Sequence, residues 1–224
     1  MRMPRIVHPG YPHHIILRGN NRRRLFSYPT EYRSFIWFVA NATRLYPVVV
    51  HNLCLMSNHV HIIATPDERD ALSDWVKSFA QRYAQTRNQK RDASGKLFEQ
   101  RFRSRPILTE SYLACATAYV ELNPIRAGLK QRLIDYPWST YRLQSEAVAR
   151  TEIPPSLWTP SPWYLSLGAH FWERARAFAA WLQHYAGQGG EGLADDHLRE
   201  FEAADAVSAP YTRRLERPNR RRAQ

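Results

Sequence analysis

Residues 47–66 contain two apolar runs, PVVVHNLCLM and HVHIIATP, joined by the polar pair Ser57-Asn58. Each run is short, rich in β-branched residues and bounded by turn-forming residues, which is typical of a β-strand. Two such runs separated by two turn residues predict a β-hairpin. The hairpin is the strongest constraint on the fold, because every other segment has to be arranged around an antiparallel sheet.

The segments on either side of the hairpin complete a recognisable order. Strands are predicted at 13–17 and 96–108, and helices at 31–46, 70–90 and 110–123, with Thr30 as the cap of the first helix and Pro124 as the end of the third. The order β-α-β-β-α-β followed by a helix predicts an α+β fold, a ferredoxin-like split βαβ sandwich with an antiparallel sheet. Helices are expected on one face, leaving the other face free to bind a partner.

Two histidines interrupt the second strand of the hairpin. Because successive strand residues point to opposite faces, Val60 and Ile62 are expected to face the core, while His59 and His61 share the other face. Two imidazoles on one face can hold a metal ion. They can also be ordinary half-exposed strand residues, so the pair needs support from elsewhere in the chain.

That support lies on the third helix. Tyr112, Ala116, Tyr119 and Asn123 recur at helical spacing and form one stripe, in which the Asn123 carbonyl is a neutral oxygen ligand one turn after Tyr119. A His-x-His pair, an amide oxygen and a phenol together make a metal-dependent nucleophilic site. Its expected chemistry is attack by the Tyr119 hydroxyl on a phosphodiester, giving a covalent phosphotyrosine, while the metal polarises a phosphate oxygen.

Positive charge is concentrated in the same half of the chain. The net charge is +12, and residues 1–150 carry 23 Lys and Arg against 11 Asp and Glu, whereas residues 151–224 carry nine of each. Arginine binds phosphate bidentately and stacks on bases, so nucleic acid is the expected partner rather than a membrane surface. The residues expected to contact DNA are Arg18, Arg22, Arg23, Arg24, Arg101, Arg103 and Arg105.

Several motifs, taken in order, resemble a known family. MSNHVHII resembles the His-hydrophobe-His motif of the HUH nucleases, and AYVELNPIRAGL resembles the tyrosine helix of the single-tyrosine transposases. PHHIILRGNNRR, LFEQRFRSRPI and YPWSTYR extend the likeness, which is greatest to the REP-associated tyrosine transposases of bacteria. It covers residues 4–143 well, is looser over 155–186 and is weak beyond.

The resemblance implies an enzyme that cuts single-stranded DNA near the foot of small hairpins with Mg²⁺ or Mn²⁺. It implies Tyr119 as the nucleophile, His59 and His61 as metal ligands, and Asn123 at the third-ligand position. It also favours a monomer over a homodimer. The alternative is a non-catalytic hairpin-binding or regulatory protein on the same fold. A zinc hydrolase is disfavoured because HVHIIATPD lacks the Asp-His that often follows His-x-His in such enzymes.

The chain is expected to divide into a catalytic, DNA-binding domain (1–145), a proline- and aromatic-rich linker (146–162), a helical extension (163–206) and a basic, disordered tail (207–224). The two cysteines, Cys54 and Cys115, form no C-x-x-C pair, which fits a reducing cytoplasm. With no signal peptide or membrane-spanning run in the sequence, we expect a bacterial cytoplasmic protein associated with the nucleoid.

Overall fold

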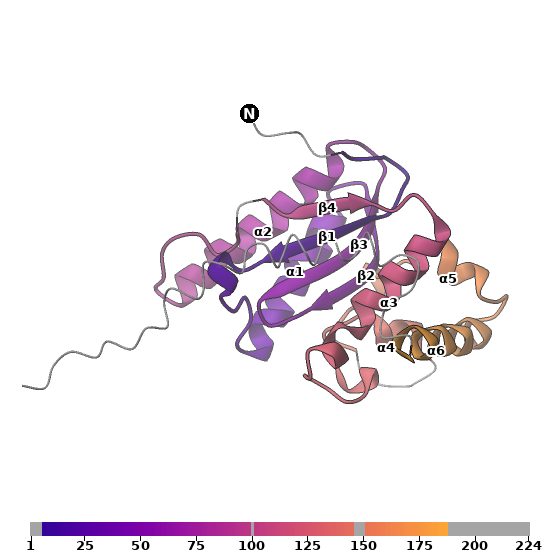
Figure 1. Cartoon of the computed structure of the whole chain (residues 1–224). Coiled ribbons are helices and arrows are strands. Elements are labelled where there is room, and N and C mark those ends of the chain that lie inside the picture. The colour runs from indigo at the N-terminus through magenta and orange to yellow at the C-terminus, as the bar shows by residue number, and fades with distance from the viewer. Residues whose placement is uncertain (1–5, 100, 146–150, 188–224) are drawn as a thin grey trace, which may run out of the picture.

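The computed structural model describes residues 6–99, 101–145 and 151–187 (Figure 1). The strands are β1 (His13–Arg18), β2 (Val48–Leu55), β3 (His59–Pro66) and β4 (Arg103–Pro106). The helices are α1 (Pro29–Thr43), α2 (Ala71–Lys90), α3 (Glu110–Arg126), α4 (Tyr141–Gln144), α5 (Pro162–Ser166) and α6 (Phe171–Gly187), with 3-10 turns η1 (Asn20–Arg22), η2 (Leu133–Asp135) and η3 (Pro155–Leu157). The predicted order of elements is confirmed. The part of the predicted helical extension after residue 187 and the predicted tail lie outside the described residues.

The four strands form one antiparallel sheet in the order β2-β3-β1-β4. Helix α1 crosses from β1 to β2 and leaves a place between them, which β3 fills after the tight turn at Ser57-Asn58. This arrangement is the split βαβ of the ferredoxin-like sandwich, so the predicted fold class is confirmed.

Helices cover both faces of the sheet. In Figure 1, α1 and α2 lie behind it and α3 crosses in front of it near β2 and β3. The α1/α2 side holds one hydrophobic core, which includes Val60, Ile62 and the large side chains Trp75 and Phe79. A second core lies on the other side, where α3, α5 and α6 pack over Cys54 and Ile63 of the sheet. The expectation of one uncovered face was therefore wrong in part, because α3 folds back over it.

Three predicted boundaries differ from the structure. Helix α1 begins at Pro29, and the Glu31 carboxylate accepts hydrogen bonds from the backbone N–H groups of Ser27 and Tyr28, so Thr30 is not the cap. Helix α3 continues past Pro124 to Arg126, because a proline in the last turn removes only one backbone hydrogen bond. Strand β4 has only four residues, and Arg101 precedes it.

A buried carboxylate fixes α3 against β2. Glu121 is fully buried, and its Oε1 accepts hydrogen bonds from Asn52 Nδ2 on β2 at 2.9 Å, from Gln144 Nε2 on α4 at 2.9 Å and from the Thr140 hydroxyl. The Thr117 hydroxyl bonds the Asn52 side chain at 3.4 Å, rather than a carbonyl of its own helix. Burial raises the pKa of the Glu121 carboxyl, and its hydrogen bonds oppose that rise.

We expect the stability difference between the wild type and Glu121→Gln to shrink as the pH rises from 4.5 to 8. The folded-state pKa of Glu121 is raised, so its contribution is fully present below the unfolded-state pKa and is lost as the pH rises through the folded-state value. Thermal unfolding midpoints of both proteins across this range measure the difference. Glu68→Gln, which removes an exposed carboxyl, is the control and should show no such trend. A pH-independent difference for Glu121→Gln would contradict the assignment.

Residues 151–187 pack against the first 145 residues. Ile153 and Leu157 are buried in the α1/α2 core, and the backbone N–H of Thr159 donates to the Val50 carbonyl at 2.8 Å. The Trp181 indole of α6 donates to the Ala114 carbonyl of α3 at 3.1 Å. The described part of the helical extension therefore supports α3 directly. Within the described residues, no helix combines the length and apolar character needed to cross a membrane.

Candidate functional site

Strand register brings Arg18, His59 and His61 together on the α3 side of the sheet. Arg18 pairs with His59 and Ile16 with His61, so these side chains share one face. His61 is 2% exposed, whereas His59 is half-buried. The two imidazole ring centroids are 4.8 Å apart, with the rings nearly perpendicular. The period-2 pattern in the sequence thus places the pair on the predicted face.

The hydrogen bonds of the two histidines engage the same ring atom in each. His59 Nδ1 lies 2.7 Å from the Asn58 side-chain oxygen, and His61 Nδ1 lies 3.0 Å from His14 Nε2. A proton on Nδ1 that donates to such a partner leaves Nε2 with its lone pair, which is the arrangement of metal-ligating histidines. The Nε2 atom of His61 is buried and has no hydrogen-bond partner.

All three imidazoles of this cluster favour the neutral form. Burial lowers the pKa of His59 to about 4, with a smaller contribution from the Arg18 charge. Burial likewise lowers the pKa of His14 to about 3, and Arg105 adds to the effect. Burial puts the pKa of His61 well below its usual value, and the neighbouring His59, His14 and Arg18 act in the same direction. Neutral imidazole is the form that binds metal.

Helix α3 brings Tyr119 to the histidines. Its side-chain ring lies 5.5 Å from the His61 ring and 5.9 Å from the His14 ring, both edge-on. The guanidinium of Arg126, two turns later, lies 5.2 Å from the Tyr119 ring and 5.6 Å from the Tyr185 ring of α6. The phenol is therefore held between the histidine face of the sheet and a cation, within cation–π distance.

Asn123 lies one turn after Tyr119, as the helical spacing predicts. Its side-chain Nδ2 donates to the Tyr119 carbonyl at 2.9 Å, so this bond leaves the side-chain oxygen unused. Among the described residues, no hydrogen bond joins Asn123 to either histidine. These residues also contain no cluster of three His, Cys, Asp or Glu side chains placed to hold a metal ion. An ion here would need the Asn123 amide, water or a phosphate to complete its ligands.

The predicted arginines fall into three groups. Arg103 and Arg105 lie on β4 opposite Ile16 and His14, and therefore share the histidine face, whereas Arg101 is exposed and precedes the strand. Arg18 is beside His59. Arg22 to Arg24 follow a tight turn that requires Gly19, because a Cβ there would lie 2.1 Å from the Arg23 carbonyl oxygen. Arg22 and Arg24 are exposed, while the Arg23 guanidinium donates to the Lys96 carbonyl.

Sequence reasoning missed His14 and Arg126. Because neighbouring strand residues face opposite ways, the adjacent pair His13-His14 gives no sign of a shared site, and both residues are expected to be structural. His13 fits this expectation, since its Nδ1 lies 2.8 Å from the Tyr11 carbonyl oxygen. The alternation of side chains along β1 could have identified His14. Ile15 and Leu17 face the α1/α2 core, so His14 has to point to the opposite face, where His59 and His61 lie. No local pattern indicated that Arg126 would lie between two tyrosines.

Comparisons with known proteins concern the family and the fold of the chain. The model of the family described as IS200-like transposases matches residues 9–123, a span that contains His59, His61, Tyr119 and Asn123. Among solved structures, a REP-associated tyrosine transposase bound to a REP hairpin matches with a TM-score of 0.56 and 19% sequence identity, covering 72% of this chain and 92% of that chain. At that identity the structural match shows a shared fold. No curated protein matches the chain.

Proposed function

The chain belongs to the IS200-like transposase family, and on that basis we propose that it is a metal-dependent single-strand DNA endonuclease and strand transferase. It cuts near DNA hairpins through a covalent 5′-phosphotyrosine intermediate. The observation that carries the proposal is the convergence of two neutral histidines and one tyrosine: His61 lies 4.8 Å from His59 and 5.5 Å from Tyr119, measured between ring centroids.

The residues present fit a divalent ion. His61 Nε2 is a buried nitrogen without a hydrogen-bond partner, which is costly unless something binds it. Burial lowers the pKa of both His59 and His61, so both can ligate at neutral pH. We therefore assign His59, His61 and the Asn123 oxygen as ligands of Mg²⁺ or Mn²⁺. When bound, such an ion polarises a phosphate oxygen and offsets the charge that develops during attack.

Tyr119 supplies the nucleophile in the proposed reaction. Its hydroxyl oxygen attacks the phosphorus of the scissile phosphodiester and gives up its proton to water. The bond from phosphorus to the 3′ oxygen breaks, and that oxygen leaves as a 3′ hydroxyl after taking up a proton. The 5′ phosphate stays on Tyr119. Because phenoxide is a good leaving group, a 3′ hydroxyl can attack the phosphotyrosine and join strands, which a water nucleophile would not permit.

We assign residues 1–145 as the catalytic, DNA-binding unit, with α6 of the extension supporting it. Arg126 is in contact with both the Tyr119 ring and the Tyr185 ring of α6. The extension can therefore hold the nucleophile in place without touching DNA. The DNA partner we propose is a hairpin with a single-stranded flank, and the hairpin in the matched solved structure supports this choice.

One assay separates the enzyme from its rival, a non-catalytic hairpin-binding or regulatory protein on the same fold. A labelled DNA hairpin with single-stranded flanks is incubated with the protein and Mg²⁺ or Mn²⁺, and the products are resolved on a denaturing gel. The enzyme should release a fragment cut near the hairpin foot and leave a fully paired duplex intact. Binding without any cleavage in either metal would favour the rival.

Binding to single-stranded or hairpin DNA is expected to weaken steeply with salt. The excess of basic over acidic residues in 1–150 supports this expectation. If about six phosphates are neutralised, log K should fall with log salt with a slope of roughly −4 for single strands, at about 0.7 per phosphate. Fluorescence anisotropy titrations between low and physiological salt measure the slope. A flat response would show that phosphate contacts do not carry the binding.

A further inference from the structure

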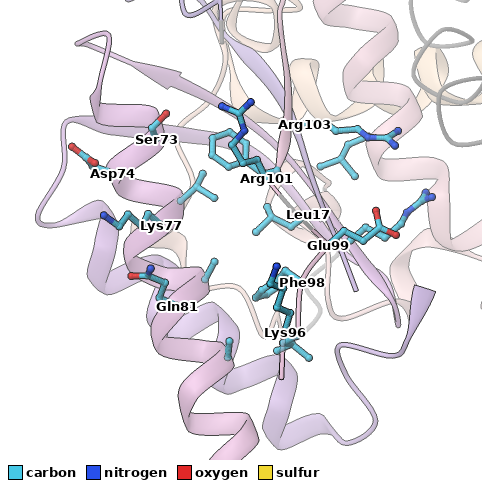
Figure 2. Close-up of a pocket in the computed structure, with 17 residues that line it drawn as sticks. Leu17, Ser73, Asp74, Lys77, Gln81, Lys96, Phe98, Glu99, Arg101 and Arg103 are labelled. Carbon is cyan, nitrogen blue, oxygen red and sulfur yellow. The ribbon is translucent and has the colours of Figure 1, made fainter. Parts of the chain in front are cut away.

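A cavity of about 770 Å³ lies beside the C-terminal end of β1, between α2 and residues 96–99 and 101–103 (Figure 2). The ladder between β1 and β4 ends at the Ile16–Arg103 pair. The two segments meet again at the Gly19–Phe98 bridge and through the Glu99 N–H, which donates to the Arg18 carbonyl at 2.8 Å. The cavity lies beside β1 between these two points of contact.

The floor of the cavity is lined by apolar side chains, and its rim is lined mainly by cationic side chains. Leu17, Val76 and Leu97 are buried in the floor, and the rings of Phe98 and Phe102 are half-buried beside it. Its basic lining residues are Arg18, Lys77, Lys96, Arg101 and Arg103, against the acids Asp74 and Glu99. Figure 2 shows Lys77 and Gln81 of α2 on one wall and Lys96 on the opposite side. An apolar surface surrounded by cationic side chains can bind a nucleotide, because the base can stack on the apolar surface while the phosphate contacts the cations.

Arg18 joins this cavity to the candidate metal site. It lines the cavity and is also the register partner of His59 on β3. Arg103 makes a similar link, because it lines the cavity and pairs with Ile16, which in turn pairs with His61. The cavity floor belongs to the α1/α2 side of the sheet and the histidines to the other side, so a DNA strand bound at both would pass around the sheet at Arg18.

We propose that this cavity binds an unpaired nucleotide of the single-stranded flank next to the hairpin. The volume falls within the range of about 300–1,000 Å³ that is typical of small-ligand sites. The phosphate would meet the rim cations, and the base would lie against Phe98 or Phe102. The inference rests on the proposed function, which supplies the hairpin DNA as the partner. It adds a second binding site, for the single-stranded flank, outside the face that carries the histidines.

The test uses the full chain and two DNA probes: a blunt DNA hairpin, and the same hairpin with a mixed-sequence single-stranded flank of about ten nucleotides. Ala80→Phe places a ring in the cavity from α2, and Lys77→Glu reverses an exposed rim charge. Arg82→Glu is the matched control, because Arg82 is exposed on the same helix and does not line the cavity. Dissociation constants for both probes are measured for each protein.

We expect Ala80→Phe to weaken binding of the flanked hairpin by at least about fivefold, the loss expected when one stacked base is displaced. Lys77→Glu should weaken it to a similar extent, because a rim cation that would meet the phosphate is replaced by an acid. Binding of the blunt hairpin should be unchanged in Ala80→Phe. In Lys77→Glu it should fall only by the small amount that Arg82→Glu loses on both probes, and Arg82→Glu should otherwise behave as wild type. Equal losses on both probes, or none from either cavity variant, would overturn the cavity while leaving the proposed function intact. Failure of the wild type to bind either probe would overturn both.

Discussion

The Tyr119→Phe variant is expected to form no covalent adduct with hairpin DNA, whereas the wild type forms one that survives denaturation. Phenylalanine keeps the ring that packs 5.5 Å from His61 and 5.2 Å from the Arg126 guanidinium, so the fold and DNA binding should be preserved. Only the hydroxyl oxygen, which is the proposed nucleophile, is lost. Labelled DNA, protein and Mg²⁺ or Mn²⁺ are incubated, and the adduct is detected on a denaturing gel.

Tyr112→Phe is the matched control for this experiment. Tyr112 belongs to the same stripe of α3 but lies two turns earlier, about 10 Å along the helix axis at roughly 1.5 Å per residue. Its side chain packs in the second hydrophobic core with 8% exposure. The control should therefore keep the adduct. An undiminished adduct with Tyr119→Phe, or one lost only with Tyr112→Phe, would show that the nucleophile has been misassigned.

Replacing either histidine by alanine should reduce cleavage by more than about a hundredfold, because loss even of a residue that only supports a metal ligand costs about 10–100-fold. DNA affinity should change by less than about threefold, since the proposed DNA contacts are made by arginines on or beside β1, β4 and the η1 turn. Asn123→Ala should weaken metal affinity less than His59→Ala or His61→Ala, because a neutral amide oxygen is the poorest ligand of the three. Chelation of the divalent ion should mimic the histidine variants.

Titration with Mn²⁺, followed by electron paramagnetic resonance, measures metal affinity without relying on activity. His170→Ala is the control, because His170 is an exposed histidine outside the cluster of His14, His59 and His61. It should leave both cleavage and Mn²⁺ affinity unchanged. Full cleavage by a His59→Ala, His61→Ala double variant would refute the assigned site.

Much of the fold followed from local pattern. Period-2 alternation in residues 59–66 placed Val60 and Ile62 in the core and the two histidines on the opposite face, because adjacent strand residues must point opposite ways. Helical spacing likewise placed Tyr119 and Asn123 one turn apart. The helix ends were harder to predict: Glu31 caps α1 from inside the helix, and α3 accommodates Pro124 in its last turn.

The sequence by itself determined the order of elements, the facing of each strand and the residue types available for chemistry. Only the tertiary structure decided which of these residues come into contact. The register of β1 on β3 places His14 Nε2 3.0 Å from His61 Nδ1, and the packing of α3, held by Glu121, brings Tyr119 to both rings. The packing of α2 against β1 and against residues 96–99 and 101–103 forms the adjoining cavity. Periodicity acts within one element, whereas register and helix docking depend on packing between residues far apart in the chain, which no local pattern encodes.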